Sequence, residues 1–251
     1  MTIYDRQNYI LTDTPLKKDL YKLFHKNDKL TILDIGGCEG EESIRYSRIF
    51  PYSSVYVFEP LPVNQTHIKQ NILNYGTNNV SLIPMAASDE DGVSTFHVSF
   101  GHPENQPKDL DWDFGNKSSS LLPPEINPHK WLNFKEQIDV KTIKLSSFLL
   151  NNDIEFVDFV HMDVQGAELK VLIGAEDYIY KIKGIWLEVA DIEIYKNQPL
   201  RKDIENFMND KGFYLVMSKM HHKVGDQFYL NKKYFKTISV LNKLFQFHKK
   251  L

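Results

Sequence analysis

The strongest constraint on the fold is a regular alternation of short apolar runs with amphipathic segments from residue 29 onward. This alternation is typical of βαβ units, in which parallel strands form one sheet and helices cover both of its faces. The predicted strands are residues 30–35, 55–58, 80–83, 93–98, 138–145, 156–162, 182–189, 213–217 and 227–230, and the predicted helices are 41–50, 63–75, 146–151, 167–174 and 200–211. The sequence therefore predicts an α/β fold with a Rossmann-like, doubly wound sheet, an antiparallel final strand and an inserted lid.

The length of 251 residues suits a single domain, 1–251, with three attachments to its core. Residues 1–28 precede the first strand and are expected to form a helical extension. Residues 101–134 contain five prolines and two tryptophans without a helical or strand period, which indicates an inserted lid or a disordered insertion. Residues 232–251 predict a C-terminal amphipathic helix. Such a helix packs on its own domain or on a second subunit of a homodimer, or makes a peripheral contact with an anionic membrane.

Charge, cysteine content and hydropathy exclude several classes of protein. A formal net charge of -3 provides no basic surplus for binding nucleic acid. The single cysteine, Cys38, excludes an internal disulfide, and no Cys/His spacing indicates a metal site. No signal peptide is evident, and no apolar run approaches the roughly 20 residues of a membrane-spanning helix. We therefore expect a cytoplasmic protein without a transmembrane segment.

The first predicted strand ends in a carboxylate and a glycine-rich turn that enters the next helix. Asp34 closes the strand, and Gly36, Gly37 and Gly40 lie in the turn, where glycine permits close approach of a ligand to the backbone. The spacing departs from the G-x-G-x-x-G of dinucleotide binders. Three further acids, Glu39, Glu41 and Glu42, precede the first basic residue, Arg45. This charge pattern would repel a pyrophosphate and attract an ammonium and a sulfonium, which favours S-adenosylmethionine over NAD.

Two more strand ends carry side chains suited to an adenosine. Glu59 follows the second strand, about 25 residues beyond Asp34, where a carboxylate accepts hydrogen bonds from both ribose hydroxyls. At the third strand end, Ala87 is small enough for an adenine ring to slide in, and Ser88 or Asp89 offers an acceptor for its amino group. The alternative for these residues is ordinary turn formation.

Several blocks of the sequence resemble the FkbM-type methyltransferases over roughly residues 30 to 215. They are the glycine turn, Phe58-Glu59-Pro60, residues 87–92, Ser119-Ser120-Leu121 and, most specifically, the block from Asp163 to Glu168. The resemblance implies methyl transfer from S-adenosylmethionine to a hydroxyl of a small molecule, a sugar or a glycan. One departure is Gln165, where the family usually has an acid.

Transfer to a hydroxyl needs alignment of the two reactants and a group that accepts a proton. His161 and Asp163 end the strand 156–162 two positions apart, so their side chains tend to lie on one side of the sheet. Glu188, near the end of strand 182–189, is the third candidate. The alternatives are a buried, hydrogen-bonded histidine for His161, and a helix cap or an orienter of the cofactor for Asp163.

Two other functions fit parts of the pattern. A non-catalytic adenosine-binding module would have the same cofactor turn without a working base. A nicotinamide-dependent reductase is disfavoured by the glycine spacing and by the acids of the turn.

Overall fold

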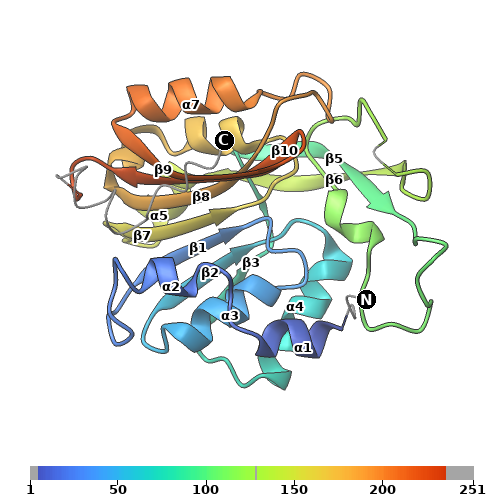
Figure 1. Cartoon of the computed structure of the whole chain (residues 1–251), viewed down its shortest axis with the longest axis horizontal. Coiled ribbons are helices and arrows are strands. Elements are labelled where there is room, and N and C mark those ends of the chain that lie inside the picture. The colour runs from blue at the N-terminus through green and yellow to red at the C-terminus, as the bar shows by residue number, and fades with distance from the viewer. Residues whose placement is uncertain (1–4, 128, 236–251) are drawn as a thin grey trace.

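The computed structural model describes residues 5–127 and 129–235, and these build a seven-stranded sheet between two layers of helices (Figure 1). The strand order is β3-β2-β1-β7-β8-β10-β9, with parallel pairing from β3 through β8, while β10 runs antiparallel to both β8 and β9. The strands are β1 (Thr31–Ile35), β2 (Ser54–Phe58), β3 (Val80–Ile83), β7 (Val157–Met162), β8 (Ile182–Ala190), β9 (Phe213–His221) and β10 (Val224–Asn231). The predicted Rossmann-like sheet with an antiparallel final strand is confirmed.

Alternation of apolar side chains along the central strands explains why helices cover both faces of the sheet. In β1, Ile32 packs on one face, whereas Leu33 and Ile35 pack on the other. The first face is covered by α2 (Lys17–Leu20), α3 (Glu41–Ile49) and α4 (Pro62–Asn74), and the second by α5 (Leu145–Asn151), α6 (Glu168–Gly174) and α7 (Arg201–Asp210). A 3-10 turn, η2 (Glu176–Lys181), links α6 to β8. Both faces of the sheet are therefore buried, as the continuous apolar runs predict.

A second sheet of three strands lies beside the first, and it contains residues 86–88, which the sequence assigned to the end of the third strand. It contains β4 (Ala86–Ser88), β6 (Asn133–Lys144) and β5 (Gly92–Phe100), in the order β4-β6-β5. The added antiparallel strand predicted at 93–98 is β5, which pairs antiparallel with β6. Residues 86–88, which the sequence suggested as an end of the third strand, instead pair with β6, because the chain leaves the main sheet after Ile83.

The insertion predicted at 101–134 is attached to the rest of the fold through its middle part, and its last two residues belong to β6. It contains the 3-10 turn η1 (Gly115–Ser118). Isolated bridges join Ser120 to His97 of β5 and Pro124 to Tyr195 in the loop after β8. The insertion is thus attached to both sheets at the edge where the strands of the main sheet end.

Both terminal segments are described in part. The N-terminal extension forms α1 (Arg6–Leu11) and α2, and α1 packs against α3. Residues 236–251, which hold most of the predicted C-terminal amphipathic helix, lie outside the described residues. Among the helices of the described ranges, none is long and apolar enough to cross a membrane.

Candidate functional site

A cavity opens at the carboxyl ends of β1, β2 and β7, where α/β sheets bind their ligands. The space free of protein atoms at this place is about 530 Å³, open solvent at the mouth included. Its lining comprises Ile35, Gly36, Cys38, Phe58, Glu59, Pro60, Asn64, Ala86, Ala87, Phe96, Asn116, Lys117, Ser119, Leu121, Asp163, Val164, Gln165 and Ala167. We call it the first cavity.

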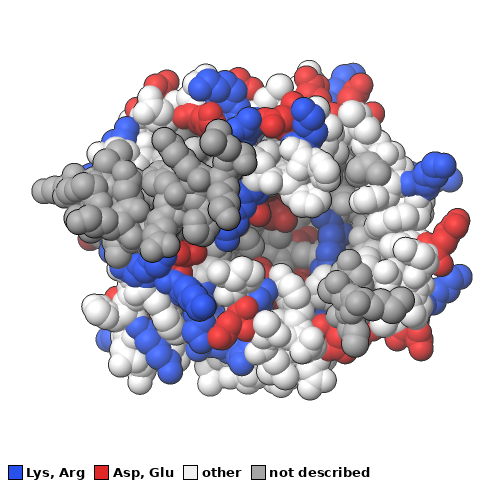
Figure 2. Space-filling model, in the orientation of Figure 1, with Lys and Arg blue, Asp and Glu red and all other residues white. Residues whose placement is uncertain are grey.

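A second cavity of about 590 Å³ adjoins the first along the same edge of the sheet. It is lined by Tyr9, Asp34, Gly36, Gly37, Cys38, Glu41, Glu42, Trp112, Lys117, His161 and Asp163. The two cavities share Gly36, Cys38, Lys117 and Asp163, so they adjoin each other, and we call the two together the trough. The face of the molecule in Figure 2 is hollowed near its centre, with acidic and basic side chains at the hollow.

The glycines of the cofactor turn allow the turn to pack against the protein's own chain. Gly36 has a φ of +82°, and a Cβ placed there would lie 1.9 Å from the backbone oxygen of Asp163. A Cβ on Gly37 would lie 2.1 Å from a methyl carbon of Val57. Gly36 lines both cavities and Gly37 the second, whereas Gly40 lines neither and begins α3 in a left-handed conformation. Gly40 therefore shapes the turn, and its contact with the cofactor stays a prediction.

Glu59 lies buried in the wall of the first cavity. Its Oε1 accepts a hydrogen bond from the backbone N–H of Leu61 at 2.7 Å, and 5% of the residue is exposed. Burial raises the pKa of Glu59 to about 8, against the opposing effect of hydrogen bonds from Leu61, Asn64 and Cys38. A buried carboxylate of this kind fits a ligand that donates hydrogen bonds, such as the two hydroxyls of a ribose.

The segment after the third strand contributes small apolar residues to the first cavity, but not its polar ones. Ala86 and Ala87 lie in the cavity wall, where their small side chains leave room for a flat ring. Ser88 and Asp89 are absent from both cavity linings. The Asp89 carboxylate is bound by Lys170 Nζ at 3.0 Å to each oxygen, and Ser88 Oγ donates to Asp89. Asp89 is thus held by Lys170, and contact of Ser88 or Asp89 with the adenine stays a prediction.

His161 and Asp34 form a buried pair at the floor of the second cavity. His161 Nδ1 lies 3.1 Å from Asp34 Oδ1, and the other oxygen of Asp34 accepts from Ser43 Oγ at 2.6 Å. Burial disfavours an imidazolium, but the hydrogen bond and negative charge of Asp34 outweigh it and raise the pKa of His161 to about 9. His161 is therefore cationic at neutral pH, which makes it a poor proton acceptor.

Asp163 and Glu188 stand at the carboxyl ends of β7 and β8, joined by the amide of Gln165. Gln165 Nε2 donates to Asp163 Oδ1 at 2.6 Å and lies 3.4 Å from Glu188 Oε2. Asp163 is open to the trough, yet the protein atoms around it limit its hydration and raise its pKa, against the opposing effect of cationic His161. Burial and the charges of Asp163, Glu168 and Asp226 raise the pKa of Glu188 well above its usual range. Both carboxyls therefore hold their protons to a higher pH than an isolated carboxyl does.

The loop between β7 and α6 is fixed by its own glutamate. Glu168 Oε1 accepts from the backbone N–H groups of Val164 and Gly166 at 3.2 and 3.3 Å. Gln165 has a φ of 54°, a left-handed conformation that non-glycine residues seldom adopt. Glu168 thus holds the strained turn that presents Asp163 and Gln165 to the trough.

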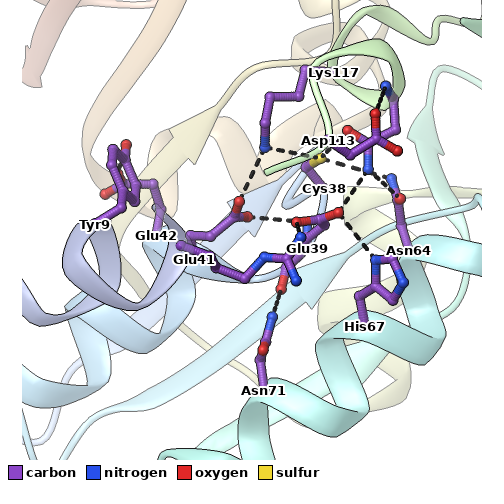
Figure 3. A network of polar contacts seen from close by, with 12 residues as sticks. Tyr9, Cys38, Glu39, Glu41, Glu42, Asn64, His67, Asn71, Asp113 and Lys117 are labelled. Carbon is purple, nitrogen blue, oxygen red and sulfur yellow. Dashed lines mark hydrogen bonds and ion pairs between the residues drawn. The ribbon is translucent and has the colours of Figure 1, made fainter. Parts of the chain in front are cut away.

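Most acids of the cofactor turn are neutralised by the protein itself, as Figure 3 shows for part of the network. Glu39 is completely buried and contacts Arg6 of α1 at 2.5 Å, His67 of α4 at 3.0 Å and Asn116 of the insertion at 2.9 Å. Glu41 pairs with Lys117 at 3.0 Å, and Glu42 with Arg45 at 2.5 Å. The attraction of a cationic ligand by these acids, which supported the cofactor prediction, is therefore largely cancelled inside the fold.

Tyr195 connects the insertion to the Gln165 turn, and its removal is expected to loosen that connection. Its Oη lies 2.7 Å from the carbonyl oxygen of Ser118 and 2.9 Å from Gln165 Oε1. Tyr195→Phe should lower the free energy of unfolding by about 0.5–1.5 kcal/mol, the usual net value of a buried hydrogen bond. Limited proteolysis within the insertion should become faster, whereas Tyr52→Phe, at an exposed tyrosine, should change neither quantity. Unchanged proteolysis in Tyr195→Phe would show that the bridges of Ser120 and Pro124 are sufficient.

Lys117 of the insertion and Tyr9 of the N-terminal helix line the trough without any signal in the sequence, whereas Trp112 is one of the tryptophans of the predicted lid. Asp226 also had no signal, and β10 places it directly opposite Glu188. Across the described ranges, no three His, Cys, Asp or Glu side chains are placed to hold a metal ion.

Comparison with known proteins agrees with this geometry. The model of the methyltransferase FkbM domain matches residues 34–215. The 2-O-methyltransferase NoeI of Sinorhizobium fredii is 30% identical over 187 residues, which cover 73% of each chain. Methyltransferase sdnD of Sordaria araneosa is 25% identical, covering 72% of this chain and 73% of its own. Methyltransferase 1 of Beauveria bassiana is 28% identical, covering 76% and 75%. The chain therefore belongs to the FkbM methyltransferase family, and its cofactor is S-adenosylmethionine.

Proposed function

We propose that the protein transfers a methyl group to a hydroxyl of a neutral, sugar-like acceptor, with Asp163 as the proton acceptor. The observation that carries this proposal is the carboxyl pair of Asp163, which lines both cavities, and Glu188, which Gln165 links to it. An alcohol is a weak acid, so its oxygen becomes a good nucleophile only as its proton is removed. The relative NoeI, named as a 2-O-methyltransferase, supports hydroxyl transfer.

The charges around Asp163 suit a base that accepts its proton in the transition state. His161, held cationic by Asp34, stabilises the ionised form of Asp163. Glu188 lies beside Asp163 and Asp226, which favour its protonated form. We therefore assign the negative charge to Asp163 and a proton to Glu188, so that Glu188 can donate a hydrogen bond to a neighbouring acceptor hydroxyl.

The same carboxyls define the class of acceptor. Asp163 and Asp226 lie close enough to Glu188 to raise its pKa, and their negative charge disfavours acceptors that carry carboxylate or phosphate groups, whereas their oxygens accept hydrogen bonds from hydroxyls. This repulsion also argues against nucleic acid as a partner. Phe134 and Tyr195 pack edge to face close to the Gln165 turn, with ring centroids 6.3 Å apart, and aromatic rings of this kind stack on sugar faces. We regard the insertion as the lid that covers the acceptor.

The cofactor site of this proposal is the first cavity. S-adenosylmethionine supplies an activated methyl group when bound. Glu59 accepts hydrogen bonds from its ribose, and Ala86 and Ala87 make room for the adenine against Leu121. Gly36 lets the backbone of the turn pass directly over Asp163, at the junction of the two cavities.

A screen for methyl transfer tests the proposed function. The protein is incubated with S-adenosylmethionine that carries an isotopically labelled methyl group, together with neutral mono- and oligosaccharides, phenols, carboxylic acids and amines. Mass spectrometry should find the label on a saccharide hydroxyl. Label found only on carboxylic acids or amines would contradict the acceptor class, and cofactor binding without transfer to any acceptor would support a non-catalytic module.

A further inference from the structure

The trough has a place for the amino-acid end of the cofactor that the first cavity does not provide. Glu59, Ala86 and Ala87 line the first cavity alone, whereas Gly36 and Asp163 line both cavities. A cofactor whose ribose contacts Glu59 therefore extends its methionine portion over Gly36 into the second cavity. This step rests on the proposed cofactor site and not on the identity of the acceptor.

The second cavity is unfavourable for a carboxylate except at one side chain. Its lining contains the acids Asp34, Glu41, Glu42 and Asp163, and its basic members in the described ranges are His161 and Lys117. His161 is bound to Asp34 at the floor of the cavity. Lys117 is shared by both cavities and therefore faces the path of the methionine portion.

The surroundings of Lys117 hold its ammonium group in place and leave it one donor. Lys117 Nζ donates to Glu41 Oε1 at 3.0 Å and to Cys38 Sγ at 3.7 Å, and an ammonium has three N–H donors. The group also lies 4.4 Å from the centroid of the Trp112 ring, a cation–π contact. Trp112 in turn packs against Tyr9 of α1, with centroids 5.3 Å apart. These contacts fix the direction of the side chain before any ligand binds (Figure 3).

We propose that Lys117 binds the α-carboxylate of S-adenosylmethionine, so that the insertion supplies part of the cofactor site as well as a cover for the acceptor. Its third N–H donor is available to the carboxylate, and the positive charge of Lys117 offsets the acids around it. Binding of the cofactor's carboxylate would therefore stabilise the segment 112–118 of the insertion.

Ligand binding without any acceptor tests this proposal. Calorimetry compares S-adenosylmethionine with its decarboxylated form, which keeps the sulfonium, the amine and the adenosine and lacks only the carboxylate. The unaltered protein should bind S-adenosylmethionine about 10- to 30-fold more tightly, the lower part of the range for a hydrogen bond between charged groups. Equal affinities would overturn the proposal without any variant having to fold.

Lys117→Met locates the preference in this side chain. The variant should bind S-adenosylmethionine about 10- to 30-fold more weakly than the unaltered protein, and its affinity for the decarboxylated form should fall by less than about threefold. Equal losses for the two ligands would show that Lys117 only fastens the insertion to Glu41, and would overturn the proposal. Lys144→Met is the matched control, because Lys144 pairs with Glu176 on the surface and should leave both affinities unchanged. An unaltered protein that binds neither ligand would instead refute the cofactor site itself.

Discussion

Asp163→Asn is expected to lower kcat by about 10²- to 10⁴-fold, which is the usual contribution of a positioned general base. Asparagine keeps the size of the side chain and can still contact Gln165, which lies 2.6 Å from Asp163 Oδ1. It cannot accept the proton of the acceptor hydroxyl. The affinity for S-adenosylmethionine should change little, because the variant removes the base and leaves Glu59 and the glycine turn intact.

Steady-state kinetics at saturating cofactor, together with calorimetry, separates the roles open to Asp163. A loss of cofactor affinity with a surviving kcat would assign Asp163 to the methionine end of the cofactor. If both quantities stay near those of the unaltered protein, Asp163 is a structural residue and Glu188 becomes the candidate base. Asp177→Asn, at an exposed aspartate of η2, removes the same charge away from the trough and should change neither quantity.

The acid limb of the rate profile has a predictable sign. The pKa of Asp163 is raised by its surroundings, and the base must be ionised to act. The rate should therefore rise with pH through a range above that of an ordinary carboxyl. This limb should disappear from the residual activity of Asp163→Asn.

Glu59→Ala should weaken the binding of S-adenosylmethionine by about 1.5–3 kcal/mol, or about 10- to 150-fold, because hydrogen bonds to a charged group are lost. The carboxylate lies in the wall of the first cavity, where Leu61, Cys38 and Asn64 donate hydrogen bonds to it. Ribose hydroxyls would complete its coordination. Calorimetry measures the loss directly, and an unaltered affinity would remove Glu59 from the ribose site.

The raised pKa of Glu59 makes the same interaction dependent on pH. In the free protein the pKa of Glu59 is about 8, and ribose hydroxyls favour the ionised form. Below pH 8 the cofactor must therefore displace a proton, so its affinity should fall by up to about tenfold for each pH unit. Glu59→Gln, which does not titrate, should flatten the dependence between pH 6.5 and 8.5. A slope that survives in Glu59→Gln would place the linked proton on another group.

The sequence by itself determined the main sheet and the residues that sit on its strand ends. The strands of the main sheet have continuous apolar runs because both faces are buried, and such runs are visible without knowledge of any partner. The carboxyl ends of parallel strands meet at one edge, so the positions of Glu59, Asp163 and Glu188 could be predicted from the strands alone. The glycine turn was recognisable for the same reason, although Gly40 lies away from the trough.

Only the tertiary structure decided which charges remain available to a ligand. Glu39, Glu41 and Glu42 are consecutive or nearly so in the sequence and look like an acidic surface, yet Arg6, Lys117 and Arg45 neutralise them. Two of these partners come from segments far away in the chain, and such pairing leaves no period in the sequence.

The placement of β4 and Asp226 was decided in the same way. β4 joins the second sheet because it pairs with β6, which begins some 45 residues later, and Ser88 and Asp89 line neither cavity. Asp226 reaches the carboxyls only through the antiparallel pairing of β10 with β8. Local patterns determine which segments become strands and helices. Contacts between distant segments determine which polar groups face the trough. The free energy of those contacts depends on the relative positions of several segments, which no single segment contains.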